Sequence, residues 1–80
     1  MTTTTNETAV KVGGSLANGA TVLAVKQYAA DDTREVVFLA QWNDEFVTWV
    51  GSADGADTYW GHYIRDIHDA VADFDSRGIY

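Results

Sequence analysis

Two short turn signals, Asn43-Asp44 and Asp54-Gly55, divide the second half of the chain into apolar runs. Turn formers of this kind between β-rich segments are typical of β-hairpin connections. A third connection of hairpin length is predicted at 29–33. The sequence therefore predicts an antiparallel four-stranded β-meander. Its strands are expected at 20–28, 34–42, 45–51 and 58–63.

The C-terminal segment changes from strand periodicity to helical periodicity, which predicts a helix over 66–77. Asp66 is expected to be the N-cap, with Asp69 in the capping-box position. Gly78 suits the C′ position that ends a helix. The fold class is therefore α+β, with the meander followed by one C-terminal α-helix packed on one sheet face. The apolar positions at helical spacing are Ile67, Ala70, Val71 and Phe74.

The N-terminal part of the chain carries weaker signals. Residues 1–8 are polar and rich in threonine, which predicts a flexible arm. Residues 9–12 could add a fifth strand at the edge of the sheet, and the glycines of 13–19 indicate a loop. A chain of 80 residues has room for one hydrophobic core. We therefore expect a single α+β domain over 9–80.

Charge and composition restrict the function classes. The formal net charge is −7, with five basic residues scattered along the chain, which argues against direct binding of nucleic acid or an anionic membrane. The chain has no cysteine, so neither a disulfide framework nor a thiolate zinc site is expected. The N-terminus lacks the features of a signal peptide, and no apolar run approaches the length of a membrane span. We expect a soluble protein of the cytoplasm.

Both faces of the predicted sheet are apolar, because side chains alternate with period two and the turns set the register. A short helix covers only one face, and an open aromatic face is a liability in a monomer. The N-terminal arm, a second subunit or a target protein is expected to cover the open face. Of these we favour a homodimer, with the Trp face as its interface. The predicted Trp face, which is the expected interaction surface, consists of Phe38, Trp42, Val47, Trp49, Trp60 and His62. The predicted opposite face consists of Val37, Leu39, Phe46, Val50, Tyr59 and Tyr63, extended by Leu23 and Val25.

Few residues suggest site chemistry. His62 could be a general base, a ligand or a pH-sensitive contact, but a partly buried strand histidine is favoured because spacing places no nucleophile beside it. His68 has acidic neighbours, yet no histidine spacing typical of a zinc site is present. The acid pairs at 31–32 and 44–45 lie in or beside turns, where aspartate is common. We predict no catalytic, cofactor-binding or metal-ligating residue and no cofactor. Gly61 is expected to lie opposite Thr48, where its missing side chain lets another group approach the sheet closely.

A sequence pattern near the C-terminus resembles small uncharacterised accessory proteins of actinobacteria and their phages. The pattern is Y-W-G-H-Y within Tyr59–Ile64, then Asp66, then A-x-x-D-F-x-x-R over Ala70–Arg77. The likeness covers about residues 20–78 and transfers no active site. It implies an accessory, non-virion protein that acts in the bacterial cytoplasm.

The leading hypothesis is a non-enzymatic protein-interaction module that self-associates and binds a bacterial host protein. An alternative is an acidic nucleic-acid mimic that inhibits a DNA-binding enzyme, since 12 residues are acidic. A third hypothesis is a small enzyme or ligand binder that uses His62 with Tyr59, Tyr63 or Trp60. It has the weakest sequence support, because the chain carries no recognisable catalytic motif.

Overall fold

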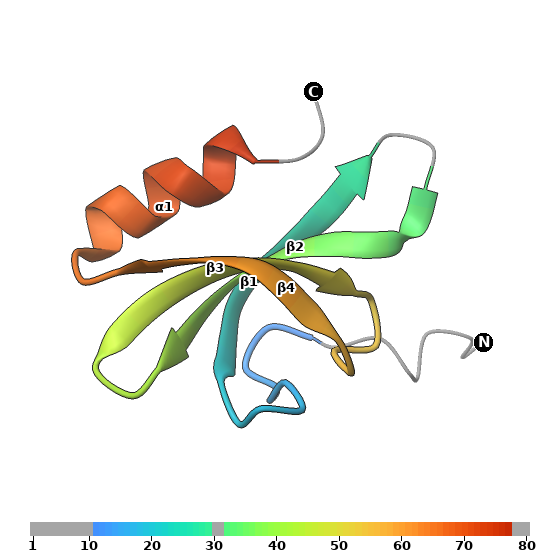
Figure 1. Ribbon diagram of the computed structural model, residues 1–80, viewed down its shortest axis with the longest axis horizontal. Helices are drawn as coiled ribbons and strands as arrows, with labels where there is room; N and C mark the ends of the chain where they lie inside the picture. The colour runs from blue at the N-terminus through green and yellow to red at the C-terminus, as the bar shows by residue number, and fades with distance from the viewer. Residues whose placement is uncertain (1–10, 30–31, 78–80) are drawn as a thin grey trace.

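The computed structural model describes residues 11–29 and 32–77 of the chain. These residues form a four-stranded antiparallel sheet in the order β1-β2-β3-β4, followed by helix α1 (Figure 1). The predicted α+β meander with a C-terminal helix is confirmed, and the element boundaries lie within two residues of the predicted ones. The elements are β1 (Thr21–Ala29), β2 (Asp32–Trp42), β3 (Glu45–Ser52), β4 (Thr58–Ile64) and α1 (Ile67–Ser76).

The β2–β3 hairpin has the predicted register. Trp42 pairs with Glu45 across a two-residue connection. The first residue of this connection, Asn43, has a φ of 56°, a left-handed conformation that asparagine adopts more readily than most residues. The pairing then continues along both strands without a shift, and Phe38 faces Trp49 as expected. A local turn signal therefore determines which side chains of β2 and β3 share a face.

The β3–β4 connection spans 53–57, which is longer than a two-residue turn. Gly55 has a φ of 77°, a conformation that glycine adopts at little cost. The start of the predicted register is confirmed, because Val50 faces Tyr59. Beyond this pair the two strands depart from the predicted register.

Helix α1 begins where the capping signal predicts. The side chain of Asp66 accepts a hydrogen bond of 2.8 Å from the backbone N–H of His68, and Asp69 lies in the first turn. The helix ends after Ser76, and the predicted C′ residue Gly78 lies outside the described residues. Ala70 and Phe74 form the buried side of the helix.

The helix covers the sheet face that carries Val37, Leu39 and Val50, which we call the helix-side face. Burial of these side chains with Ala70 and Phe74 stabilises the attachment of the helix, since apolar burial is worth about 25 cal/mol per Å². Half-buried residues complete this cluster. They are Leu23, Ala24, Tyr28, Phe46, Tyr59 and Ile64.

A register shift in β1 corrects one assignment of the sequence analysis. Val22 pairs with Ala40 and Ala24 pairs with Leu39, so the intervening Leu23 is an extra residue. This shift moves Val25 to the opposite side of the sheet, where it packs with the Trp face. The prediction that Val25 extends the helix-side face is therefore wrong, whereas that for Leu23 is confirmed.

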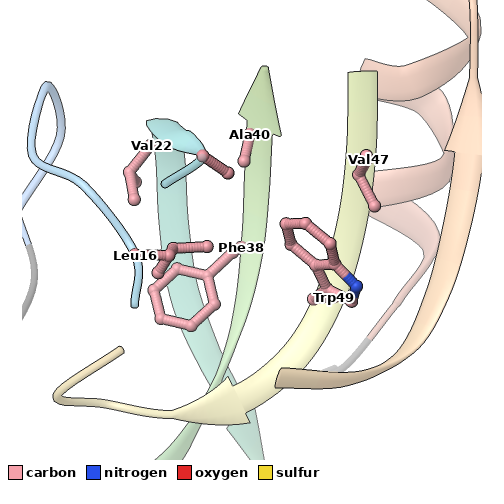
Figure 2. Packing of buried hydrophobic residues seen from close by; sticks show 7 residues of the cluster. Leu16, Val22, Phe38, Ala40, Val47 and Trp49 are labelled. Carbon is pink, nitrogen blue, oxygen red and sulfur yellow. The ribbon is translucent and has the colours of Figure 1, made fainter. Parts of the chain in front are cut away.

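The chain's own residues 11–20 pack on the Trp face, on the side of the sheet opposite α1 (Figure 1). Leu16 lies against Phe38, as Figure 2 shows, and both residues are buried. Backbone hydrogen bonds from Gly13 N to Val22 O (2.7 Å) and from Val22 N to Gly14 O (2.9 Å) join the segment to β1. The Trp face is therefore partly covered within one chain.

The N-terminal strand predicted at 9–12 is not formed by its described residues. Lys11 and Val12 adopt no strand structure, and residues 9–10 lie outside the described part, as does the predicted arm at 1–8. Within the described ranges, α1 is far too short and polar to cross a membrane.

Candidate functional site

Strand β4 contains a bulge within the Y-W-G-H-Y stretch, at Trp60 and Gly61. Trp49 of β3 lies opposite two residues, Trp60 and Gly61, so the pairing shifts by one residue. Beyond the bulge, His62 faces Thr48 and lies on the helix-side face. The prediction that His62 shares the Trp face is therefore wrong, because a one-residue shift moves every later side chain to the other face.

Gly61 makes this bulge possible. A Cβ atom at Gly61 would lie 2.6 Å from Nε1 and 2.9 Å from Cδ1 of Trp49, which is closer than such atoms approach. The predicted position of Gly61 opposite Thr48 is wrong, because His62 takes that place and the bulge sets Gly61 beside Trp49. The group that approaches Gly61 closely is the indole of Trp49. An isolated glycine in a strand is a known signal of a bulge, so the shift had a cue in the sequence.

The shift brings Tyr63 onto the Trp face in place of His62. Tyr63 pairs with Val47, and its ring centroid lies 6.1 Å from that of Trp49 and 6.3 Å from that of Trp42. The centroids of Trp42 and Trp49 are 5.5 Å apart. Tyr63, which was expected on the opposite face, therefore completes a three-ring cluster on the Trp face.

Trp60 is the exposed residue of the bulge. It has a φ of 56°, a rare conformation for a bulky residue, and its side chain is 63% exposed. Its ring lies 5.0 Å from Tyr59 in an edge-to-face arrangement and 6.5 Å from Tyr28. Both tyrosines belong to the helix-side cluster, so Trp60 lies at the rim of that face. We call Tyr28, Tyr59 and Trp60 the outer aromatic patch.

A carboxylate lies beside the outer aromatic patch. The hydroxyl of Tyr59 donates a hydrogen bond to Oε2 of Glu35. This hydrogen bond is the main cause that raises the pKa of Tyr59 to about 12, followed by burial and by the charges of Glu35 and Asp57. The phenol of Tyr59 therefore stays neutral up to high pH, and its hydroxyl is oriented toward the carboxylate of Glu35.

A second group of polar residues joins α1 to the sheet. Thr48 is fully buried, and its hydroxyl donates to Oδ2 of Asp73 at 2.5 Å. Nδ1 of His62 lies 2.9 Å from the same oxygen. Arg77 donates from Nη1 to the carbonyl and hydroxyl oxygens of Thr48, at 3.0 and 2.9 Å. We call Thr48, His62, Asp73 and Arg77 the polar cluster.

The cluster lowers the pKa of Asp73. Burial of the carboxyl alone raises this pKa, but the hydrogen bonds from Thr48 and His62 and the charges of His62 and Arg77 outweigh it. Asp73 is therefore held as a carboxylate, which only accepts hydrogen bonds. The Nδ1 atom of His62 consequently carries the hydrogen that it donates to Asp73.

The polar cluster allows two chemical interpretations. A carboxylate at Nδ1 leaves Nε2 of His62 as an oriented base, which is the arrangement of many hydrolases. However, the one buried hydroxyl of the cluster, that of Thr48, donates to Asp73 itself. The bonds of Arg77 also end on Thr48. We therefore interpret the cluster as the polar attachment of α1 to β3 and β4.

Of the other candidates, His68 and Asp44 keep the expected placement, at the start of α1 and in the β2–β3 connection, whereas Asp31 lies outside the described residues. His68 and Asp66 form the helix cap, and Asp54 accepts from the hydroxyl of Ser52 at 2.6 Å within the β3–β4 connection. The hydrogen bond from Ser52 is the main cause that lowers the pKa of Asp54. Within 11–29 and 32–77, no three acidic or histidine side chains are grouped closely enough to hold a metal ion.

The residues expected to form one interaction surface are divided by the structure. Phe38 and Val47 are fully buried, and Trp49 is 4% exposed. Trp42 is half-buried against them. Trp60 and His62 lie elsewhere, in the outer aromatic patch and the polar cluster. Two aromatic residues of β4 are exposed, Tyr63 on the Trp face (53%) and Trp60 in the outer aromatic patch (63%). The outer aromatic patch has no counterpart among the surfaces predicted from the sequence.

Comparison with protein-family models, with curated proteins and with solved structures gives no match to this chain. The geometry of the site is therefore the basis of the functional argument.

Proposed function

We propose that this chain is a non-enzymatic protein-interaction module that binds a partner protein through the outer aromatic patch. Exposed Trp60 is the observation that carries the proposal. Tryptophan and tyrosine dominate the residues that supply binding energy in protein interfaces. A bulky residue at positive φ costs about 1–3 kcal/mol and persists where the surrounding structure demands it. The bulge therefore presents Trp60 at a cost to stability, which supports a role in binding.

The setting that we propose comes from the sequence pattern. The Y-W-G-H-Y stretch and the A-x-x-D-F-x-x-R segment resemble accessory proteins of actinobacteria and their phages. We therefore propose an accessory protein of a phage or mobile element that acts in the bacterial cytoplasm, with a host protein as its partner. The outer aromatic patch and the A-x-x-D-F-x-x-R segment lie on the same side of the sheet, because Asp73 and Phe74 pack there.

Self-association has less support than the sequence suggested. The expected homodimer rested on an open Trp face, and Leu16 and Ala20 pack on that face within the same chain. The bulge at Trp60 also disrupts the exposed edge of β4, and bulged edges disfavour pairing with a second strand. A homodimer remains an alternative that a mass measurement tests.

Capture experiments with matched variants test the proposal. The immobilised wild-type chain, Trp60→Gly and Val71→Ala are each exposed to an actinobacterial lysate. Glycine suits the positive φ at position 60, so this variant removes the ring without straining the bulge. Val71 is an exposed apolar residue on α1 and serves as the control.

We expect a protein that the wild-type chain and Val71→Ala retain and that Trp60→Gly loses. The proposal fails if all three chains retain the same proteins. Light scattering over a range of concentrations then tests the homodimer. A mass that doubles for the wild-type chain but not for Trp60→Gly would identify a second copy as the occupant of the patch.

A further inference from the structure

The surroundings of the outer aromatic patch are acidic. Glu35 accepts the hydroxyl hydrogen of Tyr59, and Asp57 lies close enough for its charge to act on the same phenol. The chain as a whole carries a formal net charge of −7. An approaching group therefore meets aromatic rings and negative charge at the same place, which favours a cation.

The chain already contains a cation–ring contact of this type on the same face. Nζ of Lys26 lies 4.9 Å from the ring centroid of Phe74. Tryptophan attracts cations more strongly than phenylalanine does, because its ring quadrupole is larger. Trp60 is 63% exposed as a residue, so it is accessible to a group from outside the chain.

We propose that Trp60, Tyr59 and Glu35 receive an arginine or lysine side chain from a basic segment of the partner protein. This inference rests on the proposed interaction function and specifies the chemistry of the partner. The cation contacts the indole of Trp60, and the carboxylates of Glu35 and Asp57 supply the opposite charge. Arginine suits the site best, since its planar guanidinium both stacks on aromatic rings and pairs with carboxylates.

Charge argues against the other occupants. A second copy would bring the same acidic residues of a chain with net charge −7 against this patch, which costs energy across a symmetric interface. Nucleic acids and anionic membranes are repelled for the same reason. A basic protein segment is the partner class whose charge complements the patch.

A capped hexa-arginine peptide tests the proposal, with a capped hexa-citrulline peptide as its uncharged control of similar shape. Binding is followed through the indole N–H signals of Trp42, Trp49 and Trp60 in NMR spectra. We expect the arginine peptide to shift the Trp60 signal most and the citrulline peptide to leave it unchanged. Trp60→Gly should weaken binding about tenfold, as expected for loss of a central aromatic contact.

Charge variants separate the patch from general attraction to an acidic chain. Glu35→Gln should weaken arginine-peptide binding about threefold, in the range of one exposed charge contact. Asp44→Asn removes the same charge in the β2–β3 connection, and it should leave the affinity within the error of measurement. Equal losses in both variants would overturn the proposal, because the attraction would then not depend on the patch.

The outcomes also distinguish this inference from the proposed function. If Trp60→Gly loses a captured protein but no variant alters peptide binding, the interaction function stands and the cationic partner is wrong. If the citrulline peptide binds as tightly as the arginine peptide, the patch selects shape and not charge, which also overturns the proposal. A Trp60-dependent doubling of the free chain's mass would assign the patch to a second copy.

Discussion

Nδ1 of His62 lies 2.9 Å from Oδ2 of Asp73, so a histidine of the edge strand β4 holds the helix α1 through one carboxylate. This contact exists because the bulge at Trp60 and Gly61 turns His62 toward the helix. The same carboxylate accepts the buried hydroxyl of Thr48. The ionised carboxylate of Asp73 therefore adds a pH-dependent contribution to the attachment of the helix.

Replacement of Asp73 should change how stability depends on pH. The folded-state pKa of Asp73 lies below its ordinary value of 3.8. A depressed folded pKa means that the stabilisation is complete above the unfolded pKa and is lost as pH falls through the folded pKa. Asp73→Asn should therefore lower the free energy of unfolding by about 1–3 kcal/mol at neutral pH and flatten its decline in acid.

Urea unfolding of the wild-type chain and Asp73→Asn, from about pH 7 to about pH 2.5, measures this dependence. Asp75→Asn is the control, because Asp75 is exposed on the same helix and should leave the wild-type acid slope intact. An acid slope that is identical in Asp73→Asn and the wild-type chain would contradict the role of Asp73.

Removal of the Thr48 hydroxyl should lower the free energy of unfolding more than removal of its methyl group. Thr48→Val keeps the side-chain volume but removes the hydroxyl. The variant therefore loses the hydrogen bond that this hydroxyl donates to Asp73 and the one that it accepts from Arg77. Asp73 keeps its contact with His62, and Arg77 keeps its bond to the carbonyl oxygen of Thr48. Because two hydrogen bonds to charged groups are lost, the free energy of unfolding should fall by about 1–3 kcal/mol. Thr48→Ser retains the hydroxyl and should lose less, mainly the contribution of one methyl group. Thermal unfolding of both variants under one condition shows which of the two is less stable.

Gly61 should not accept a side chain. Gly61→Ala places a Cβ against the indole of Trp49, and such overpacking costs typically about 1–3 kcal/mol. Gly19→Ala is a useful comparison, because nothing lies within 4 Å of its Cβ position and only its φ of 94° is unfavourable. Both variants lose stability, but only Gly61→Ala should shift the indole N–H signal of Trp49 in NMR spectra. An unchanged Trp49 signal would show that the bulge tolerates the side chain.

The elements of this fold were predictable because their signals are local. The turn at Asn43-Asp44 determines the β2–β3 register, and the cap at Asp66 determines where α1 begins. Of the three-ring cluster on the Trp face, Trp42 and Trp49 were assigned to that face correctly from the alternation of side chains along their strands. Period-two alternation and helix capping depend on neighbours in sequence, so they need no knowledge of the tertiary structure.

The site was harder to predict because it depends on register shifts. The bulge at Gly61 moves His62 toward Asp73 and Tyr63 toward Trp49. A glycine in a strand indicates a bulge but does not say how many residues are inserted or on which strand. Burial of the Trp face by Leu16 is a contact between a loop and a distant strand, and loop positions leave no periodic signal.

Tyr59 should ionise only at high pH. Its pKa is raised to about 12 from the ordinary value of 10.0, chiefly by the hydrogen bond to Glu35. A raised folded pKa means that the associated stability is complete below about pH 10 and is lost as pH rises toward about pH 12.

Glu35→Gln should move the tyrosinate transition assigned to Tyr59 back toward its ordinary range, because the charged acceptor is gone. The ultraviolet absorbance of tyrosinate, compared between the wild-type chain and Tyr59→Phe, identifies the transition of this residue. Glu45→Gln removes a carboxylate at the opposite end of the sheet, beside Arg65 at 4.0 Å, and should leave the transition in place. If both glutamine variants shift it equally, the hydrogen bond is not the cause.

Leu16 should stabilise the isolated chain, because it covers the Trp face from within. Leu16→Ala removes a side chain that is 3% exposed and lies against Phe38, and such a change costs about 2–5 kcal/mol. Val12→Ala is the matched control, since Val12 is 64% exposed and its loss should alter stability by less than about 0.5 kcal/mol. Chemical unfolding at low protein concentration measures both, with a dye that binds exposed apolar surface as a second readout. If Leu16→Ala is as stable as Val12→Ala, the segment 11–20 does not cover the sheet and the Trp face again requires a partner.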